Sequence, residues 1–157
     1  MSKSIFKERT SVAMVEEGKL LAPKFNNDGL IPVVVTEYKT GNVLMLSYMN
    51  KEALEKTILT GEGYYWSRSR RLLWKKGETS GMVHEIKELL IDDDQDSVWL
   101  KVKVKGLGAS CHVGYKSCFY RKLEKTTDES IQLKFIENAK TFDPEIVYTD
   151  SQNPTKL

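Results

Sequence analysis

The stretch from Asp92 to Arg121 constrains this chain most, because it carries two chemically different sets of metal ligands around one strand. Carboxylates come first, at Asp92, Asp94 and Asp96. Sulfur and imidazole donors follow, at Cys111, His112 and Cys118. Hard carboxylate oxygens suit magnesium or calcium, whereas thiolate and imidazole suit zinc. One short segment therefore offers two kinds of metal ligand.

The acidic run has a regular alternation that needs a reason. In an extended segment successive side chains point to opposite faces, so the three alternating acids would project together and Asp93 would project away from them. Converging carboxylates repel one another unless a divalent cation lies between them. A calcium EF-hand loop does not fit, because Ser97 replaces the required glycine and Lys103 replaces the bidentate acid. A solvated surface turn is the alternative.

The sulfur and imidazole donors fall short of a closed structural zinc site, which needs four ligands. Cys111 and Cys118 match no standard zinc-finger spacing. They could anchor an open catalytic site if another segment or another chain supplies the rest, with His112 as a general acid or base. Two buried thiols and a single disulfide are the alternatives, although a cytosolic chain keeps its thiols reduced.

The hydrophobic pattern predicts mostly strands and one main helix. The helix is predicted over residues 51–60, after the N-cap Asn50 and before Gly61. A basic loop is predicted over 68–81 and a turn over 92–96. Strands are predicted over 30–38, 43–49, 64–67, 84–91, 98–105 and 118–121. This arrangement predicts a β-rich α+β domain.

Aromatic and basic residues combine between Tyr64 and Lys76. Arginine and serine side chains can donate to phosphate oxygens, and Trp66 and Trp74 could stack on a base. A single-stranded nucleic-acid platform uses the same residue types, and a solvated loop is the simplest alternative. The net charge is only +2, so a small phosphorylated nucleotide explains the patch better than a long nucleic acid does.

The 157 residues suffice for one domain with its own core. The N-terminus lacks the apolar segment of a signal peptide, and no apolar run reaches transmembrane length. We therefore expect a cytoplasmic protein that binds neither membrane nor nucleic acid.

Together these blocks resemble the phosphoribosyl-AMP cyclohydrolase family of histidine biosynthesis. The resemblance spans roughly residues 20–121. Its main blocks are residues 24–26, 29–32, 40–41, 43–46, 48–50, 52–54, 65–70, 73–74, 76–81, 92–96, 108–112 and 117–121. It implies a metal-dependent hydrolase that opens the adenine ring at the N1–C6 bond of 1-(5-phosphoribosyl)-AMP. It also implies a compact, barrel-like domain that forms an intertwined homodimer with active sites shared between subunits.

The resemblance also implies roles for individual residues. Zinc would be held by Cys111 and Cys118, magnesium by Asp92, Asp94 and Asp96, and His112 would shuttle a proton. Substrate contacts would come from Trp66, Ser67, Arg68, Ser69, Arg70, Trp74, Lys76, Glu78 and Ser80.

Two positions depart from the family pattern. Asp93 stands where the family usually has cysteine as a zinc ligand, so we expect a harder and weaker zinc site completed by this carboxylate. Met82 and His84 stand where histidine or asparagine, and then glutamine, are usual. His84 is therefore either a replacement ligand or base, or a strand residue that faces outward.

The resemblance leaves two other functions open. One is an enzyme of the same fold with altered metal or purine-nucleotide specificity, and the other is a non-catalytic nucleotide- or RNA-binding module. The cyclohydrolase-like domain is expected over residues 1–121. Residues 122–157 form a C-terminal extension of unknown role, too short to be the pyrophosphohydrolase domain that is fused to some relatives.

Overall fold

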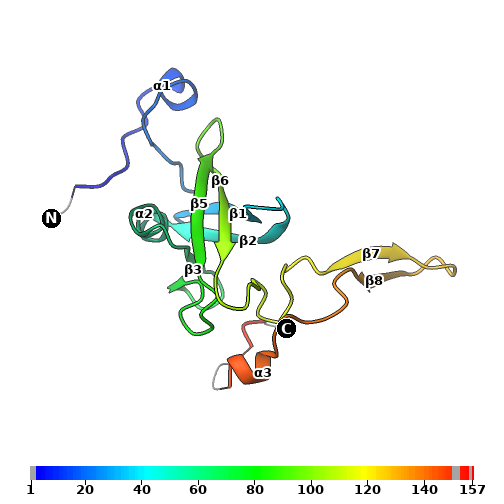
Figure 1. Cartoon of the computed structure of the whole chain (residues 1–157). Helices are drawn as coiled ribbons and strands as arrows, with labels where there is room; N and C mark the ends of the chain where they lie inside the picture. The colour runs from blue at the N-terminus through cyan, green and yellow to red at the C-terminus, as the bar shows by residue number, and fades with distance from the viewer. Residues whose placement is uncertain (1–2, 150–152, 156) are drawn as a thin grey trace.

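An open four-stranded sheet forms the centre of the protein (Figure 1). The structure is a computed structural model that describes residues 3–149, 153–155 and 157. The strands lie in the order β2-β1-β6-β5. β1 is antiparallel to β2 and parallel to β6, so the sheet is mixed. Their bounds are Leu30–Glu37 (β1), Val43–Asn50 (β2), His84–Ile91 (β5) and Val98–Val104 (β6), which confirms the strands predicted there.

Helix α2, Lys51–Thr60, covers one face of the sheet. The side chain of Asn50 accepts a hydrogen bond from Ala53 N, and Gly61 ends the helix with a left-handed φ of 72°. Glycine suits that conformation because it has no Cβ to clash. The helix, its caps and its boundaries confirm the prediction. The core between helix and sheet contains fully buried Ile31, Val33, Val35, Met49, Ala53, Leu54, Tyr65, Leu100 and Val102.

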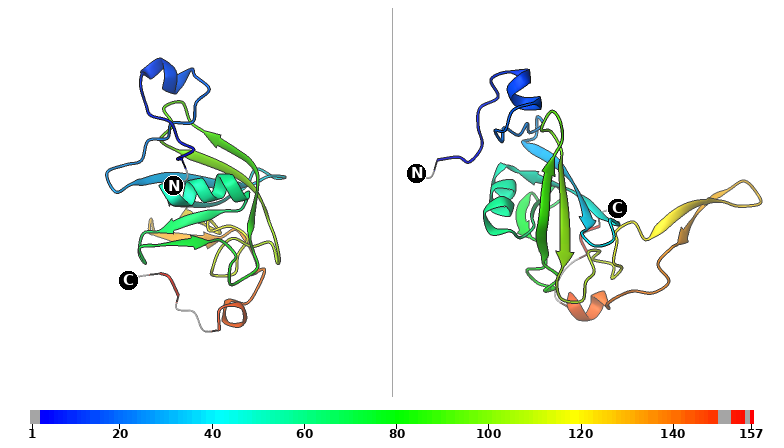
Figure 2. Two further views of the ribbon diagram at one scale, coloured as in Figure 1. Left: turned by 90° about the vertical axis from the view of Figure 1, so that its left-hand side faces the viewer. Right: turned by 45° about the horizontal axis from the view of Figure 1, so that its top comes forward.

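Two separate hairpins complete the strands. The first joins β3, Tyr64–Ser67, to β4, Leu72–Lys75, and packs beside α2. The second joins β7, Arg121–Lys125, to β8, Ile131–Phe135, and projects from the body (Figures 1 and 2). We call this second hairpin, residues 121–135, the arm.

Two local predictions are wrong. The basic loop predicted over 68–81 contains β4, because residues 72–75 pair with β3 after a turn in which Arg71 takes a left-handed φ of 52°. The strand predicted over 118–121 begins only at Arg121. Residues 118–120 are irregular, because the amide of Cys118 bonds to the carbonyl of Leu44 at 2.7 Å instead of joining a ladder.

The α+β class is confirmed, but the barrel-like shape is wrong. Within the described residues β2 and β5 are the two edges of the central sheet and do not pair with each other. A barrel requires those edges to meet. Here the concave side is filled by α2 and the β3–β4 hairpin, so the sheet is covered rather than closed.

The opposite face of the central sheet has no covering layer in the described chain. The strand register places Leu46, Val34, Trp99 and Leu90 side by side across all four strands. Leu46 is 55% exposed, Trp99 38% and Leu90 37%. The solvated face of a sheet is normally polar, so this apolar row is an exception.

Two short helices lie at opposite ends of the molecule (Figure 1). Helix α1, Val12–Glu16, lies near the β5–β6 turn, and helix α3, Pro144–Val147, lies near the loop that follows β6. No helix in the described ranges has both the length and the apolar character needed to span a membrane.

Candidate active site

A cleft of about 820 Å³ opens between β2, the β3–β4 hairpin, the loop over residues 76–81 and the segment after β6. Residues of the C-terminal extension, among them Tyr148 and Asn153, complete its wall. All nine residues predicted to bind substrate line this one cleft: Trp66, Ser67, Arg68, Ser69, Arg70, Trp74, Lys76, Glu78 and Ser80. The structure therefore brings together, in one cleft, nine residues that are spread over fifteen positions of the sequence.

The β3–β4 turn gives the cleft positive charge. Arg68 and Arg70 lie in this turn, and the guanidinium of Arg68 stacks 4.1 Å from the ring centroid of Tyr48 on β2. The amide of Arg70 donates to Ser67 Oγ at 3.3 Å, which shapes the turn. A guanidinium presents paired donors that match phosphate oxygens, so the turn is suited to bind a phosphate group.

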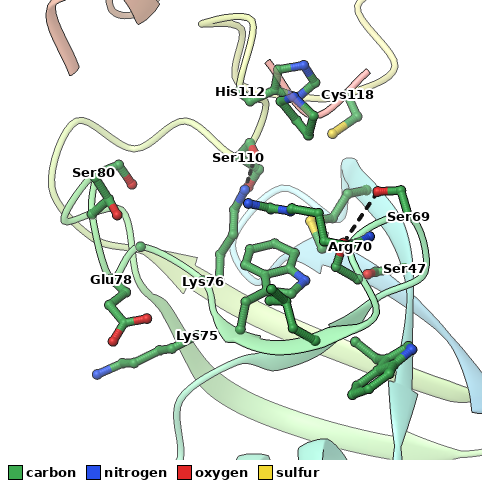
Figure 3. A pocket seen from close by; sticks show the side chains of 18 of the residues that line it. Ser47, Ser69, Arg70, Lys75, Lys76, Glu78, Ser80, Ser110, His112 and Cys118 are labelled. Carbon is green, nitrogen blue, oxygen red and sulfur yellow. Dashed lines mark hydrogen bonds between the residues drawn. The ribbon is translucent and has the colours of Figure 1, made fainter. Parts of the chain in front are cut away.

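Lys76 crosses the cleft wall instead of reaching into solvent (Figure 3). Its Nζ donates to the carbonyl of Ser110 at 2.5 Å, and the side chain is buried. Burial lowers the pKa of Lys76, and the neighbouring thiols of Cys118 and Cys111 oppose that shift. The result is a buried cation beside the two cysteines.

Cys111 and Cys118 form a hydrogen-bonded pair. The bond from Cys118 lowers the pKa of Cys111, with a further lowering from the positive charge of Lys76, and it raises the pKa of Cys118. Both cysteines are free, so the disulfide alternative does not apply. One member of the pair is thus poised as a thiolate, which is the form that binds metal.

His112 lines the same cleft. Burial lowers the pKa of His112, the charge of Lys76 lowers it further, and a hydrogen bond with Asn153 opposes both. Its Nε2 is buried and has no hydrogen-bond partner among the described residues. A buried polar atom left unpaired is unfavourable, so this nitrogen is suited to meet a group that enters the cleft.

The turn over residues 92–96, the acidic turn, joins β5 to β6 and lies at the end of β6 opposite the cysteines (Figure 1). Oxygens of Asp92, Asp94 and Asp96 lie within 4.8 Å of one another, the one such cluster of three potential ligands in the described part of the chain. The acids do not converge through an extended strand, as the alternation predicted. The backbone turns here instead, and Asp92 accepts hydrogen bonds from the amides of Asp96 and Ser97 at 2.9 and 3.0 Å. The spacing still suits one divalent cation.

Charge repulsion is visible in this acidic turn. Desolvation raises the pKa of Asp96, and the hydrogen bond with Asp94 and the charges of Asp94 and Asp92 raise it further. For Asp92 desolvation is outweighed by hydrogen bonds from Ser97 and Asp96, so its pKa lies below the usual value. A bound cation would favour the ionised form of all three carboxylates.

Sequence reasoning did not identify Gln95, which holds the acidic turn to the N-terminal segment. Its buried amide accepts from Ala22 N at 2.8 Å and donates to the carbonyl of Val15 at 3.0 Å. Arg9 also donates to the carbonyl of Asp94 at 2.8 Å. One neutral amide among four acids was the only signal of this role.

Sequence reasoning also did not identify Glu137. This residue supports the loop over residues 109–120, which carries both cysteines and which we call the cysteine loop. Its carboxylate accepts the amides of Lys116 and Ser117 at 2.9 and 3.0 Å, directly before Cys118. Because Glu137 belongs to the extension, residues beyond the expected domain help to shape the site. Nothing local in the sequence points to this contact.

His84 lies inside the protein and does not face outward. It is fully buried, and both ring nitrogens are engaged, Nδ1 by the Tyr65 hydroxyl at 2.8 Å and Nε2 by Ser110 Oγ at 2.9 Å. These contacts leave no ring nitrogen available to a metal. Asp93 is also far from the cysteines within one chain, because the two turns lie at opposite ends of β6, roughly 20 Å apart at about 3.3 Å per strand residue (Figure 1).

Comparison with known proteins gives a consistent result. A family model described as Phosphoribosyl-AMP cyclohydrolase matches residues 45–120. A phosphoribosyl-AMP cyclohydrolase of Rhodopseudomonas palustris is 51% identical over 134 residues, which cover 85% of this chain and 88% of the relative. Relatives with the same name from Bradyrhizobium diazoefficiens (49%, covering 85% and 94%) and Nitrobacter winogradskyi (47%, covering 88% and 94%) match similarly. The chain therefore belongs to the phosphoribosyl-AMP cyclohydrolase family.

Proposed function

We propose that this chain hydrolyses the N1–C6 bond of 1-(5-phosphoribosyl)-AMP and so opens the purine ring in histidine biosynthesis. The observation that carries the proposal is that arginine and serine side chains able to donate to phosphate line the same cleft as His112 and Cys118. Relatives at about half identity bear the name of this activity.

The cleft divides the work of binding. Arg68, Arg70 and the serines beside them hold the phosphates, since guanidinium and hydroxyl groups both donate to phosphate oxygens. Trp66 and Trp74 offer flat apolar surfaces for the purine. Glu78 and Ser80 line the other side and are placed to bind sugar or base edges (Figure 3).

The residues present fit a zinc ion only in part within one chain. Cys111 and Cys118 supply two sulfur ligands, and we assign the third to Asp93 of a second copy, where relatives usually carry cysteine. A bound zinc ion supplies Lewis-acid chemistry that lowers the pKa of water from 15.7 to about 7. The carboxylate makes the donor set harder, so this site should bind zinc more weakly than a three-cysteine set.

The acidic turn fits magnesium. Asp92, Asp94 and Asp96 offer three hard oxygen donors at one point, and magnesium is usually held by carboxylates together with substrate phosphates. The ion would neutralise these acids and a phosphate group of the substrate.

His112 is the residue that moves the proton. Its buried, unpartnered Nε2 lies in the cleft wall, and its lowered pKa keeps the imidazole neutral and able to accept a proton near pH 7. In the reaction water adds to C6 and the N1–C6 bond breaks. His112 accepts a proton from the water, N1 takes up a proton, and C6 becomes a carboxamide.

The active form is a homodimer in this proposal. The two ligand sets lie at opposite ends of β6, so one chain cannot join them, whereas two chains in opposite orientation can (Figure 1). A second copy would also cover the apolar row of Leu46, Val34, Trp99 and Leu90.

The arm supports the same partner. Its register places Leu123, Ile131, Leu133 and Phe135 on one face, and these side chains are 75%, 65%, 47% and 52% exposed. The other face carries Lys122, Glu124, Gln132 and Lys134. An isolated hairpin is at best marginally stable in water, so an amphipathic arm beside the cysteine loop fits contact with a second copy.

We place this enzyme in the cytoplasm, where free thiols stay reduced.

Ring opening of phosphoribosyl-AMP by the purified protein tests the activity. We expect turnover that a chelator abolishes and that zinc with magnesium restores. Absence of turnover with every divalent metal would contradict the proposal. Tight, strongly salt-dependent RNA binding in its place would favour the binding-module alternative.

Mixing inactive variants tests the shared site. At a magnesium concentration that limits the Asp94→Asn variant, Asp94→Asn and Cys118→Ser should each inactivate a homodimer, but a mixed dimer regains one intact site. Random mixing should therefore restore about a quarter of the wild-type activity. A site contained within one chain would give no recovery.

A further inference from the structure

A buried polar chain links the core to the cleft and is not used by the reaction described above. It runs from Tyr65 on β3 to His84 on β5 and then to Ser110, which lines the cleft. Tyr65 and His84 are fully buried, and Ser110 is 1% exposed. Polar groups so deep in a core normally have a specific task, because leaving any of them unpaired is unfavourable.

The surrounding chain is fitted closely to the Tyr65–His84 pair. A Cβ added at Gly63 would lie 2.9 Å from Tyr65 Oη and 3.0 Å from His84 Cβ. The Gly63 amide donates to the carbonyl of His84 at 2.9 Å, and its own carbonyl accepts from Lys76 N at 3.0 Å. The two rings are therefore held edge to face, at 5.8 Å and 86°.

Only one placement of the hydrogen atoms satisfies the hydrogen bonds from Tyr65 through His84 to Ser110. Burial raises the pKa of Tyr65, so its hydroxyl keeps its proton and needs an acceptor, and the one contact of that hydroxyl in the described residues is His84 Nδ1. A neutral imidazole carries one N–H. If Nδ1 accepts from Tyr65, then Nε2 carries the hydrogen and donates it to Ser110 Oγ. The opposite arrangement would leave the phenol hydrogen buried without an acceptor.

The imidazole remains neutral in this setting. Burial, followed by the charge of Lys76, lowers the pKa of His84 well below its usual value. The neutral ring therefore keeps the same donor and acceptor atoms over the working pH range.

Ser110 receives hydrogen bonds from two directions and has one donor left. Its carbonyl accepts from Lys76 Nζ at 2.5 Å, and its Oγ accepts from His84. Its amide donates to the carbonyl of Lys116 at 2.9 Å. The hydroxyl hydrogen of Ser110 is then free to point into the cleft. Cys111 and His112 follow directly, so the same contacts fix their backbone (Figure 3).

We propose that His84 is a positioning residue that acts through Ser110: it anchors the Ser110–His112 segment and directs the Ser110 hydroxyl toward an acceptor on the bound nucleotide. The inference rests on the proposed function for the ligand class. This role also explains why a histidine suits position 84. Its acceptor nitrogen meets Tyr65 on β3, and its donor nitrogen, on the other side of the ring, meets Ser110.

A double-mutant cycle tests this role, with the dissociation constant for AMP from calorimetry and kcat/KM as readouts. Ser110→Ala and His84→Leu should each weaken AMP binding and lower kcat/KM by roughly 10-fold or more, the usual effect of losing an outer contact of a site. The double variant should be no worse than the stronger single variant, because both remove the same hydrogen bond. His84→Gln should recover most of the affinity, since an amide also supplies one acceptor and one donor.

Cobalt(II) affinity, followed by the thiolate-to-cobalt absorption band, gives a readout independent of turnover. His84→Leu should weaken it because the Cys111 backbone loses an anchor. Thr60→Val is the matched control: it removes the hydrogen bonds from Thr60 Oγ1 to the carbonyl of Lys56 (2.7 Å) and from the amide of Glu62 to Thr60 Oγ1 (3.2 Å), at the end of α2 and away from the cleft and the apolar row. It should lower the melting temperature without changing AMP or cobalt binding.

Additive effects of His84→Leu and Ser110→Ala, or an unchanged AMP constant in Ser110→Ala, would overturn the inference. If His84→Leu does not fold, Ser110→Ala and His84→Gln still decide it. A wild-type protein that binds AMP but opens no ring would contradict the proposed function alone, because the cycle on AMP binding would remain readable.

Discussion

The acidic turn and the cysteine loop occupy opposite ends of β6, and they are built in opposite ways. The acidic turn leaves its carboxylates near solvent and is braced from behind by Gln95 and the N-terminal segment. The cysteine loop buries Cys111 beside the buried cation of Lys76 and leaves Cys118 exposed, and it is held by Glu137 of the extension.

The difference matches the chemistry expected at each end. Magnesium loses its water reluctantly and suits a partly hydrated carboxylate site, whereas a thiolate needs a neighbouring cation or metal to exist near neutral pH. Each end is braced by a different terminus of the chain. The residues outside the central sheet therefore support the chemistry rather than merely extend the domain.

The largest expected effect falls on the cysteine loop. Cys118→Ser removes a proposed zinc ligand and should lower activity by more than about 100-fold, because losing a ligand should cost more than losing a group that only orients one. Elemental analysis should show lost zinc with retained fold. Full zinc content in this variant would mean that the metal lies elsewhere.

A smaller loss is expected at the acidic turn. Asp94→Asn removes one of three carboxylates, and the magnesium concentration for half-maximal activity should rise by roughly 10-fold to 100-fold. Excess magnesium should restore turnover, whereas it should not restore Cys118→Ser. Asp128→Asn, in the turn of the arm, serves as the control and should leave the magnesium concentration for half-maximal activity unchanged.

The brace from the extension should matter less again. Glu137→Gln retains one acceptor oxygen but loses the charged acceptor shared by the amides of Lys116 and Ser117, so zinc affinity should fall by about 10-fold. Glu124→Gln, on the arm, removes only an exposed ion pair with Lys134 and should leave zinc affinity unchanged. Equal effects of the two variants would show that the brace has no role.

The smallest expected effect is a pH dependence of folding stability that comes from His84, beside the cysteine loop. The folded-state pKa of His84 is depressed, so below about pH 6.5 the unfolded chain binds a proton that the folded protein excludes. Stability from this group is thus present above that pH and is lost as pH falls, by about 1 kcal/mol between pH 6 and 5. Denaturant unfolding should show this loss in the wild type relative to His84→Gln. A parallel pH dependence in both proteins would contradict it.

Much of the fold could be predicted because its signals are local. Alternation in β6, the Asn50 cap and Gly61 each act within a few residues, and all three were predicted correctly. The errors at residues 72–75 and 118–120 have one cause. Pairing partners decide whether such short segments become strands, and a partner is not visible in the segment itself.

For the site, residue types and spacing singled out both cysteines, His112 and the three acids, because these functional groups are read directly from the sequence. The family resemblance supplied the list of nine cleft residues. Only the folded chain decided which groups meet. It separated Asp93 from the cysteines by the length of β6, buried Lys76 and His84 around Ser110, and brought Glu137 to the cysteine loop. These contacts join residues 20 or more positions apart, so they depend on how the sheet and its terminal segments pack rather than on any local pattern.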